Sequence, residues 1–179
     1  MDPAIRFFDS TAKDYDVKHY GQAVRSLMTV RQERVLELVD TLALPQGAKV
    51  LDAGCGPGYL VQALALRGFN VCGADAAAGM LRNAKARLSA TPSTHAVEFE
   101  LCSIEELPYP DESFDLVCST GVIEYLQDDA KALSEMFRVL KPGGHLVLPV
   151  TNRLSPGLRC VSPVTNRLSL SAKRIGDRG

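Results

Sequence analysis

Apolar positions recur every three or four residues in the segment that follows the aromatic N-terminal stretch. This spacing puts them on one side of a helix, so the segment is predicted to be an amphipathic helix with one buried face. The helix is predicted to end at Leu44–Gly47, where proline and glycine interrupt the pattern. The positions that carry the period are Val24, Leu27, Met28, Arg31, Val35, Leu38, Val39 and Leu42.

Short apolar runs alternate with helical stretches as far as residue 150. Short buried runs bounded by glycine, proline or aspartate are typical of strands in a parallel sheet. The alternation predicts an α/β fold, with a Rossmann-like, doubly wound, mostly parallel sheet and helices on both faces. Strands are expected over residues 49–53, 70–74, 97–101, 114–119 and 145–150, and helices over 59–67, 80–90 and 128–140.

The composition is that of one globular domain. The chain has 179 residues, of which 46% are apolar and 23% charged, close to the globular average. There is no apolar run long enough to cross a bilayer and no secretory signal, so a cytoplasmic protein without a membrane span is expected. Five cysteines, none at C-x-x-C spacing, favour reduced thiols over a disulfide framework or a metal site.

Charge is distributed unevenly between residues 1–150 and residues 151–179. The first part holds 14 basic and 20 acidic side chains, and the second holds 6 basic and 1 acidic. An acidic body lacks the basic face that binds nucleic acid, so no such partner is expected. Residues 151–179 are a basic tail that is expected to be poorly ordered, and Val150–Ser155 recurs there as Val164–Ser169.

The strongest chemical signal is the turn after the first strand, Asp52-Ala-Gly-Cys-Gly-Pro-Gly58. Its three glycines allow a tight turn and close approach of a ligand, and the next helix points free N–H groups at the same place. A dinucleotide loop needs G-x-G-x-x-G, but Tyr59 stands at the third glycine position. Because Asp52 would repel a pyrophosphate, it favours a ligand that carries positive charge.

A second carboxylate, Asp75, ends the second strand. In dinucleotide-binding folds an acid at this place accepts hydrogen bonds from ribose hydroxyls. Ligands of such sheets bind beyond the carboxyl ends of the strands. Asp75 is therefore expected to share one site with the glycine turn, with Ser103-Ile104 and with Ser119-Thr120.

These motifs resemble those of class I S-adenosylmethionine-dependent methyltransferases of the small-molecule type, similar to the ubiquinone and menaquinone biosynthesis methylases. The resemblance covers about residues 5–150 and makes residues 1–150 the cofactor-binding domain. Besides the turn and Asp75, it rests on Ser103–Tyr109, Asp111–Asp115 and Phe137–Gly144. It implies S-adenosylmethionine as cofactor, S-adenosylhomocysteine as product and a small organic acceptor.

The resemblance also implies roles for individual residues. Asp75 would bind the ribose, and Tyr20 belongs with Phe8 and Tyr15 to a segment that closes over cofactor and substrate in the family. The methionine end of the cofactor would be held by Asp52, Ala53, Gly54, Cys55, Gly56 and Gly58. Adenine would be flanked by Ala76 and Met80 and faced by Ser103 and Ile104, and the sulfonium would lie beside Ser119 and Thr120.

Two departures from the family pattern concern the site. Ser103 replaces the usual aspartate, so a hydrogen bond to the adenine amine would be uncharged and the cofactor affinity lower. Tyr125 stands where a histidine is common. Methyl transfer by in-line displacement needs mainly alignment and exclusion of water. A general base is optional, and the candidates are His19, Glu124 and Tyr125.

The largest departure lies at the C-terminus. The family's sheet continues past the fifth strand, but only 29 residues follow Val150, with no clear strand alternation. The last one or two strands are expected to be missing, which leaves the fifth strand as an open edge for a second copy or a partner chain.

Three interpretations stay open at this point. The first is an active methyltransferase, and the second is a truncated or non-catalytic S-adenosylmethionine-fold module or partner subunit. The third is a nicotinamide-dependent oxidoreductase, which Asp52 and Tyr59 disfavour.

Overall fold

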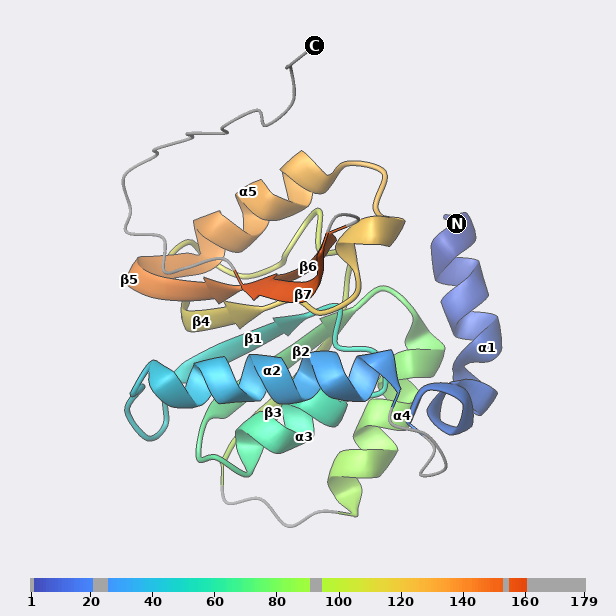
Figure 1. Ribbon diagram of the computed structural model, residues 1–179, viewed down its shortest axis with the longest axis horizontal. Helices are drawn as coiled ribbons and strands as arrows, with labels where there is room; N and C mark the ends of the chain where they lie inside the picture. The colour runs from blue at the N-terminus through green and yellow to red at the C-terminus, as the bar shows by residue number, and fades with distance from the viewer. Residues whose placement is uncertain (1, 21–25, 91–94, 153–154, 161–179) are drawn as a thin grey trace.

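The computed structural model describes residues 2–20, 26–90, 95–152 and 155–160. A five-stranded sheet forms the middle layer and helices cover both of its faces (Figure 1). The helices are α1 (Pro3–Tyr20), α2 (Leu27–Thr41), α3 (Tyr59–Ala65), α4 (Ala78–Ser89), α5 (Asp129–Val139) and the 3-10 helix η1 (Ile123–Tyr125). The strands are β1 (Lys49–Ala53), β2 (Asn70–Asp75), β3 (Val97–Leu101), β4 (Phe114–Cys118), β5 (Leu140–Val147), β6 (Pro149–Asn152) and β7 (Ser155–Cys160).

The strand order of the main sheet is β3-β2-β1-β4-β5, and each strand is parallel to its neighbours. The chain runs outward from β1 through β2 to β3 and then crosses back to β4, on the other side of β1. This reversal creates a switch point beyond the carboxyl ends of β1 and β4, where doubly wound sheets bind ligands. The predicted doubly wound parallel sheet is confirmed.

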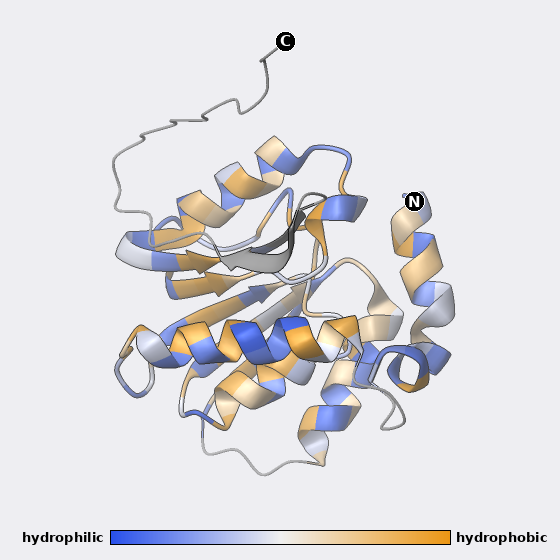
Figure 2. Ribbon diagram, in the orientation of Figure 1, coloured by the Kyte–Doolittle hydropathy of each residue, from blue (hydrophilic) through white to orange (hydrophobic). Residues whose placement is uncertain are grey.

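Alternate side chains of a strand point to opposite faces of the sheet, and helices bury both faces of its central strands. Val50 belongs to an apolar cluster with Val35 of α2 and Leu64 of α3. Its neighbour Leu51 belongs to a second cluster with Met136 of α5. Figure 2 shows the central strands mostly in the colour of apolar residues, between helices of mixed colour. The apolar strands therefore hold the two helical layers together.

Residues 3–20, for which the sequence pattern predicts no element, form helix α1. Its apolar side packs on α4, where Ala12 and Tyr15 form a cluster with Met80, and its Phe8 ring packs on Tyr125. A hydrogen bond adds to them, since the backbone N–H of Gly79 donates to Asp9 Oδ1 at 2.6 Å. None of the described helices, this long one included, combines the length and apolar character that a membrane crossing requires.

The fifth strand is longer than its pattern predicts. The sequence predicts a helix stop at residues 141–144 and a strand from His145, whereas β5 begins at Leu140, directly after α5. Leu140 pairs with Phe114 and His145 pairs with Leu116, so a bulge between the two pairs takes up the extra residues. Glycine and proline therefore mark an irregular strand here rather than a loop.

The segment after β5 differs from the expectation that strands are absent there. β6 and β7 form a separate antiparallel pair, in which Val150 lies opposite Arg159. In the described part of the chain neither strand joins the main sheet, in which β5 is an edge strand. The second copy of the repeat, Val164–Ser169, and the tail from residue 161 lie outside the described residues.

Replacement of Met136 by alanine tests the cluster under α5. Met136 is fully buried, so Met136→Ala removes apolar contacts and leaves a cavity that should lower the free energy of unfolding by about 3 kcal/mol. The matched control is Phe137→Ala, because that neighbouring ring is 42% exposed and its loss should cost about 1 kcal/mol or less. Urea unfolding measures both; equal losses would contradict the placement of α5.

Candidate functional site

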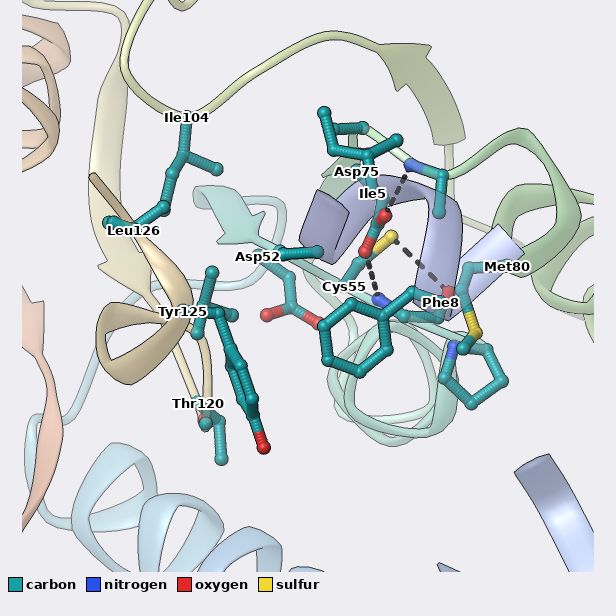
Figure 3. A pocket seen from close by; sticks show the side chains of 18 of the residues that line it. Ile5, Phe8, Asp52, Cys55, Asp75, Met80, Ile104, Thr120, Tyr125 and Leu126 are labelled. Atoms are coloured by element: carbon teal, nitrogen blue, oxygen red, sulfur yellow. Dashed lines mark hydrogen bonds between the residues drawn. The ribbon is translucent and has the colours of Figure 1, made fainter. Parts of the chain in front are cut away.

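A pocket opens at the carboxyl ends of β1, β2 and β4, at the switch point of the sheet (Figure 3). Helix α1 contributes Ile5, Phe8 and Tyr15 to its wall. The residues implied by the resemblance that line it are Asp52, Gly54, Cys55, Gly56, Asp75, Ala76, Met80, Ser103, Ile104, Thr120 and Tyr20. Ala53, Gly58 and Ser119 are not in the pocket lining.

The glycine turn is built by backbone bonds to the neighbouring strand. The N–H groups of Gly54 and Cys55 both donate to the carbonyl oxygen of Ala74, at 2.7 and 2.9 Å. Gly54 needs to be glycine, because its φ is +80° and a Cβ there would lie 2.2 Å from Val122 Cγ2. The turn therefore packs tightly on β2 and on the segment after β4.

Asp75 ties the glycine turn to the start of α4. Its Oδ2 accepts a hydrogen bond from Gly56 N and its Oδ1 accepts one from Ala77 N, both at 2.8 Å. Burial raises the pKa of this carboxyl group, and hydrogen bonds from the backbone oppose that rise. Each oxygen keeps a further lone pair, so the group can still accept from a ligand hydroxyl.

Asp52 is 2% exposed and lines the same pocket. Burial, and then the charge of Asp75, raise the pKa of its carboxyl group to about 8. No ion pair among the described residues involves Asp52. In Figure 3 its carboxyl group points into the space beside Phe8 and Tyr125. A cationic ligand would stabilise the ionised form.

Two hydroxyl groups after β4 are buried without a hydrogen-bond partner among the described residues, Ser119 Oγ and Thr120 Oγ1. Thr120 lines the pocket, whereas Ser119 is fully buried and does not line it. A buried polar group without a partner costs free energy. The Thr120 hydroxyl is thus placed to bond a ligand at the switch point.

The opposite end of the pocket contains an acid that the sequence analysis missed. Glu105 lines the pocket together with Ser103 and Ile104. Its backbone N–H donates to Ser103 Oγ at 3.2 Å, and the Ser103 hydroxyl lies 3.4 Å from Glu105 Oε2. The signal that could have pointed to Glu105 is its position two residues after Ser103, where the resemblance leads us to expect an acid.

The three candidate bases are placed differently. Tyr125 lines the pocket, and its ring packs edge-on against Phe8 with centroids 5.0 Å apart. Glu124 pairs with Arg31 at 3.2 Å, and His19 packs against the ring of Tyr15. Neither Glu124 nor His19 belongs to the described lining. The pocket thus brings in only Tyr125 of the three.

The comparison with known proteins decides the family. The sequence matches the family described as methyltransferase domain over residues 51–148, more than half of the chain. The chain belongs to this methyltransferase family. The matched segment runs from β1 to the end of β5, so it contains both strands of the switch point and the turn that carries Gly54.

Curated relatives of this methyltransferase-family chain include enzymes with different acceptors. The ubiquinone biosynthesis O-methyltransferase of Alkalilimnicola ehrlichii is 31% identical over 154 residues, 85% of this chain and 60% of that protein. The malonyl-[acyl-carrier protein] O-methyltransferase of Erwinia billingiae is 39% identical over 112 residues, 62% of this chain and 42% of that protein. The chain spans about half the length of the curated relatives it matches.

Solved structures share the fold. An S-adenosyl-L-methionine-dependent methyltransferase fold from Methanococcus maripaludis superposes with a TM-score of 0.66 at 19% identity, over 81% of this chain and 63% of that one. A chain from the Haloferax volcanii complex between the Trm112 methyltransferase activator and a methyltransferase gives 0.64 at 27% identity, over 84% and 61%. The [4+2]-cyclase SpnF gives 0.61 at 26% identity, over 65% and 44%.

Substitution of Gly58 tests the packing behind the turn. Gly58 has φ +80°, and a Cβ there would lie 2.8 Å from the Cβ of Ala84. Gly58→Ala should lower the free energy of unfolding by about 2 kcal/mol, from backbone strain and crowding together. Gly143→Ala is the control, because Gly143 also has φ +80° but has open space around its Cβ position. Gly143→Ala should lower the free energy of unfolding by about 1 kcal/mol. An equal loss in Gly58→Ala would refute the crowding between residue 58 and Ala84.

The raised pKa of Asp52 predicts a pH dependence of stability. The folded protein retains a proton on this carboxyl group up to about pH 8, whereas the unfolded chain releases it near pH 4. The stability that this proton contributes is complete below pH 4 and is lost as the pH rises towards 8. Between pH 5 and 7 the free energy of unfolding of the wild type should fall, relative to Asp52→Asn, by about 1 kcal/mol per pH unit. Urea unfolding at several pH values measures this difference, and parallel pH profiles would contradict it.

Proposed function

We propose that this protein binds S-adenosylmethionine and transfers its methyl group to a small organic acceptor, releasing S-adenosylhomocysteine. The main support is Asp52, a buried carboxyl group on the pocket wall without a cationic partner among the described residues. A ligand with an ammonium and a sulfonium group supplies the missing positive charge. Family membership and Asp75 at the end of β2 point to the same cofactor.

The residues of the pocket fit the parts of this cofactor in order. The backbone between Gly54 and Gly56 and the Asp52 carboxylate would hold its methionine end, and Asp75 would accept hydrogen bonds from the ribose hydroxyls. Met80 and Ile104 offer apolar surfaces for the adenine ring. When bound, S-adenosylmethionine supplies an electrophilic methyl group on a good leaving group.

Apolar side chains of the pocket wall fit an apolar acceptor. Ile5 and Phe8 of α1, Met28 of α2 and Leu126 after η1 belong to this wall. These side chains exclude water from the transfer region and orient an apolar acceptor by contact. In-line displacement then depends on alignment of the acceptor, and the polar side chains that could position it include Gln32, Thr120 and Tyr125.

A second candidate function is a methyltransferase-fold module that acts only with another chain. The observation that favours it is the edge of the main sheet, because β5 pairs there only with β4 among the described residues. An open strand edge is a site for pairing with another chain. The Haloferax volcanii relative, solved in a complex with an activator, is a precedent for such a partner.

Calorimetric titration with S-adenosylmethionine, S-adenosylhomocysteine and NAD tests the cofactor. We expect micromolar binding of the first two and no binding of NAD. Asp75→Asn should weaken S-adenosylhomocysteine binding at least about tenfold, because it removes the charge that ribose hydroxyls and the turn both bond. Asp111→Asn is the control, since Asp111 is an exposed partner of Arg138 on the surface, and it should bind like the wild type.

The outcomes separate the two candidate functions. Absence of binding by folded wild-type protein would refute cofactor use altogether. Binding together with methylation in an acceptor screen of neutral apolar phenols and alcohols would support the active enzyme. The module would be favoured if the protein alone binds S-adenosylmethionine but methylates no acceptor, and if methylation appears only after a partner chain is added.

A further inference from the structure

Arg87, in the last turn of α4, contacts the glycine turn, the residue after it and helix α1. Its Nε donates to the carbonyl oxygen of Pro57 at 3.0 Å, and its Nη2 donates to Asp16 Oδ2 at 2.6 Å. Its guanidinium carbon lies 3.4 Å from the centroid of the Tyr59 ring. Pro57 belongs to the turn, Tyr59 begins α3 and Asp16 belongs to α1. One side chain therefore joins α4 to three other parts of the site.

The ring of Tyr59 extends this connection to the end of α1. Tyr20, the last residue of α1, stacks on Tyr59 with centroids 3.7 Å apart and an interplanar angle of 12°. Because Arg87 and Tyr20 both lie within 4 Å of the ring centroid, they must occupy opposite faces of the ring. Tyr20 in turn lines the pocket. Through Arg87, the stacked rings connect the glycine turn to the pocket wall.

Helix α1 has other attachments, among them the packing of Phe8 on Tyr125, but Arg87 also bonds the glycine turn. Apart from a small apolar cluster, α1 is held to α4 by Asp9 and by Asn83, whose Nδ2 donates to Ala12 O at 2.7 Å. The Arg87–Asp16 pair is partly buried, with side chains 19% and 33% exposed. Charge-assisted hydrogen bonds in such a setting are stronger than neutral ones.

We propose that Arg87 is a positioning residue that couples the glycine turn to the covering helix α1. By bonding Pro57 and Asp16 at once, it makes the cofactor-binding shape of the turn and the closed position of α1 stabilise each other. Release of S-adenosylhomocysteine then requires both to move. This proposal rests on the proposed cofactor function, and it assigns Arg87 no role in the methyl transfer step.

The test compares three variants of the full chain. Arg87→Gln removes the contacts of the guanidinium group with Pro57, Asp16 and Tyr59, and Asp16→Asn weakens the bond between Arg87 and α1. Arg67→Gln is the matched control, because Arg67 pairs with Asp40 on the surface, away from the pocket lining. Two quantities are measured for each: the dissociation rate of S-adenosylhomocysteine, and hydrogen exchange of the α1 amides with and without saturating ligand.

In the wild type, saturating S-adenosylhomocysteine should slow exchange across α1. Arg87→Gln should raise the dissociation rate about tenfold and abolish this slowing at saturation, while Asp16→Asn should raise the rate about threefold and reduce the slowing. Arg67→Gln should match the wild type in both.

Other results would overturn the proposal. Wild-type dissociation and wild-type protection of α1 in Arg87→Gln would do so, as would faster dissociation with α1 protection intact, which would make Arg87 a support of the turn alone. If Arg87→Gln fails to fold, Asp16→Asn decides, and wild-type protection of α1 there overturns the coupling. If the wild type does not bind S-adenosylhomocysteine, the proposed function fails. Hydrogen exchange of the α1 amides in the ligand-free variants still reports whether Arg87 holds α1 in place. Equal exchange rates in Arg87→Gln and Arg67→Gln would overturn the attachment of α1 by Arg87.

Discussion

The carboxylate of Asp75 is the constraint on which the site depends. By accepting hydrogen bonds from Gly56 and from Ala77, it fixes the glycine turn after β1 against the turn that leads from β2 into α4. Parallel pairing brings the two strand ends together, with Ala53 opposite Ala74. Asp75 thereby fixes the backbone N–H groups of the glycine turn that would meet a ligand. The same ligand would also contact Asp75, so ligand binding and the shape of the turn depend on one carboxylate.

The part of the molecule set by local pattern was predictable from sequence. Buried strands, the helices between them and the switch point follow from apolar runs and from the handedness of βαβ units, so the position of the pocket follows too. Asp52, Asp75 and the three glycines stood out because strand ends and positive φ values restrict residue type strongly. The structure brings Asp52, Asp75 and the glycine turn together, and their roles in holding a cofactor remain predictions.

What the sequence did not predict depends on contacts between distant segments. Helix α1 has a mixed face, and its position against α4 comes from bonds such as the one between Asp9 and Gly79, which no spacing encodes. Glu105 lines the pocket wall, and its carboxylate accepts a hydrogen bond from the backbone N–H of Asp128, 23 residues further along the chain. The hairpin of β6 and β7 was missed because Pro149 and the glycine and proline of β7 are poor strand formers, and antiparallel pairing compensated for them.

Helix α1 and Asp52 are linked through the dielectric environment of the pocket. Burial is the main cause of the raised pKa of Asp52, and Phe8 and Tyr20 of α1 line the pocket that this carboxyl group faces. Movement of α1 away from the site would admit water, stabilise the carboxylate and lower its pKa. With α1 closed, the ionised form is favourable only beside a positive charge. The cofactor proposed here would supply that charge, and the exclusion of water by α1, which methyl transfer also requires, would strengthen its attraction to Asp52.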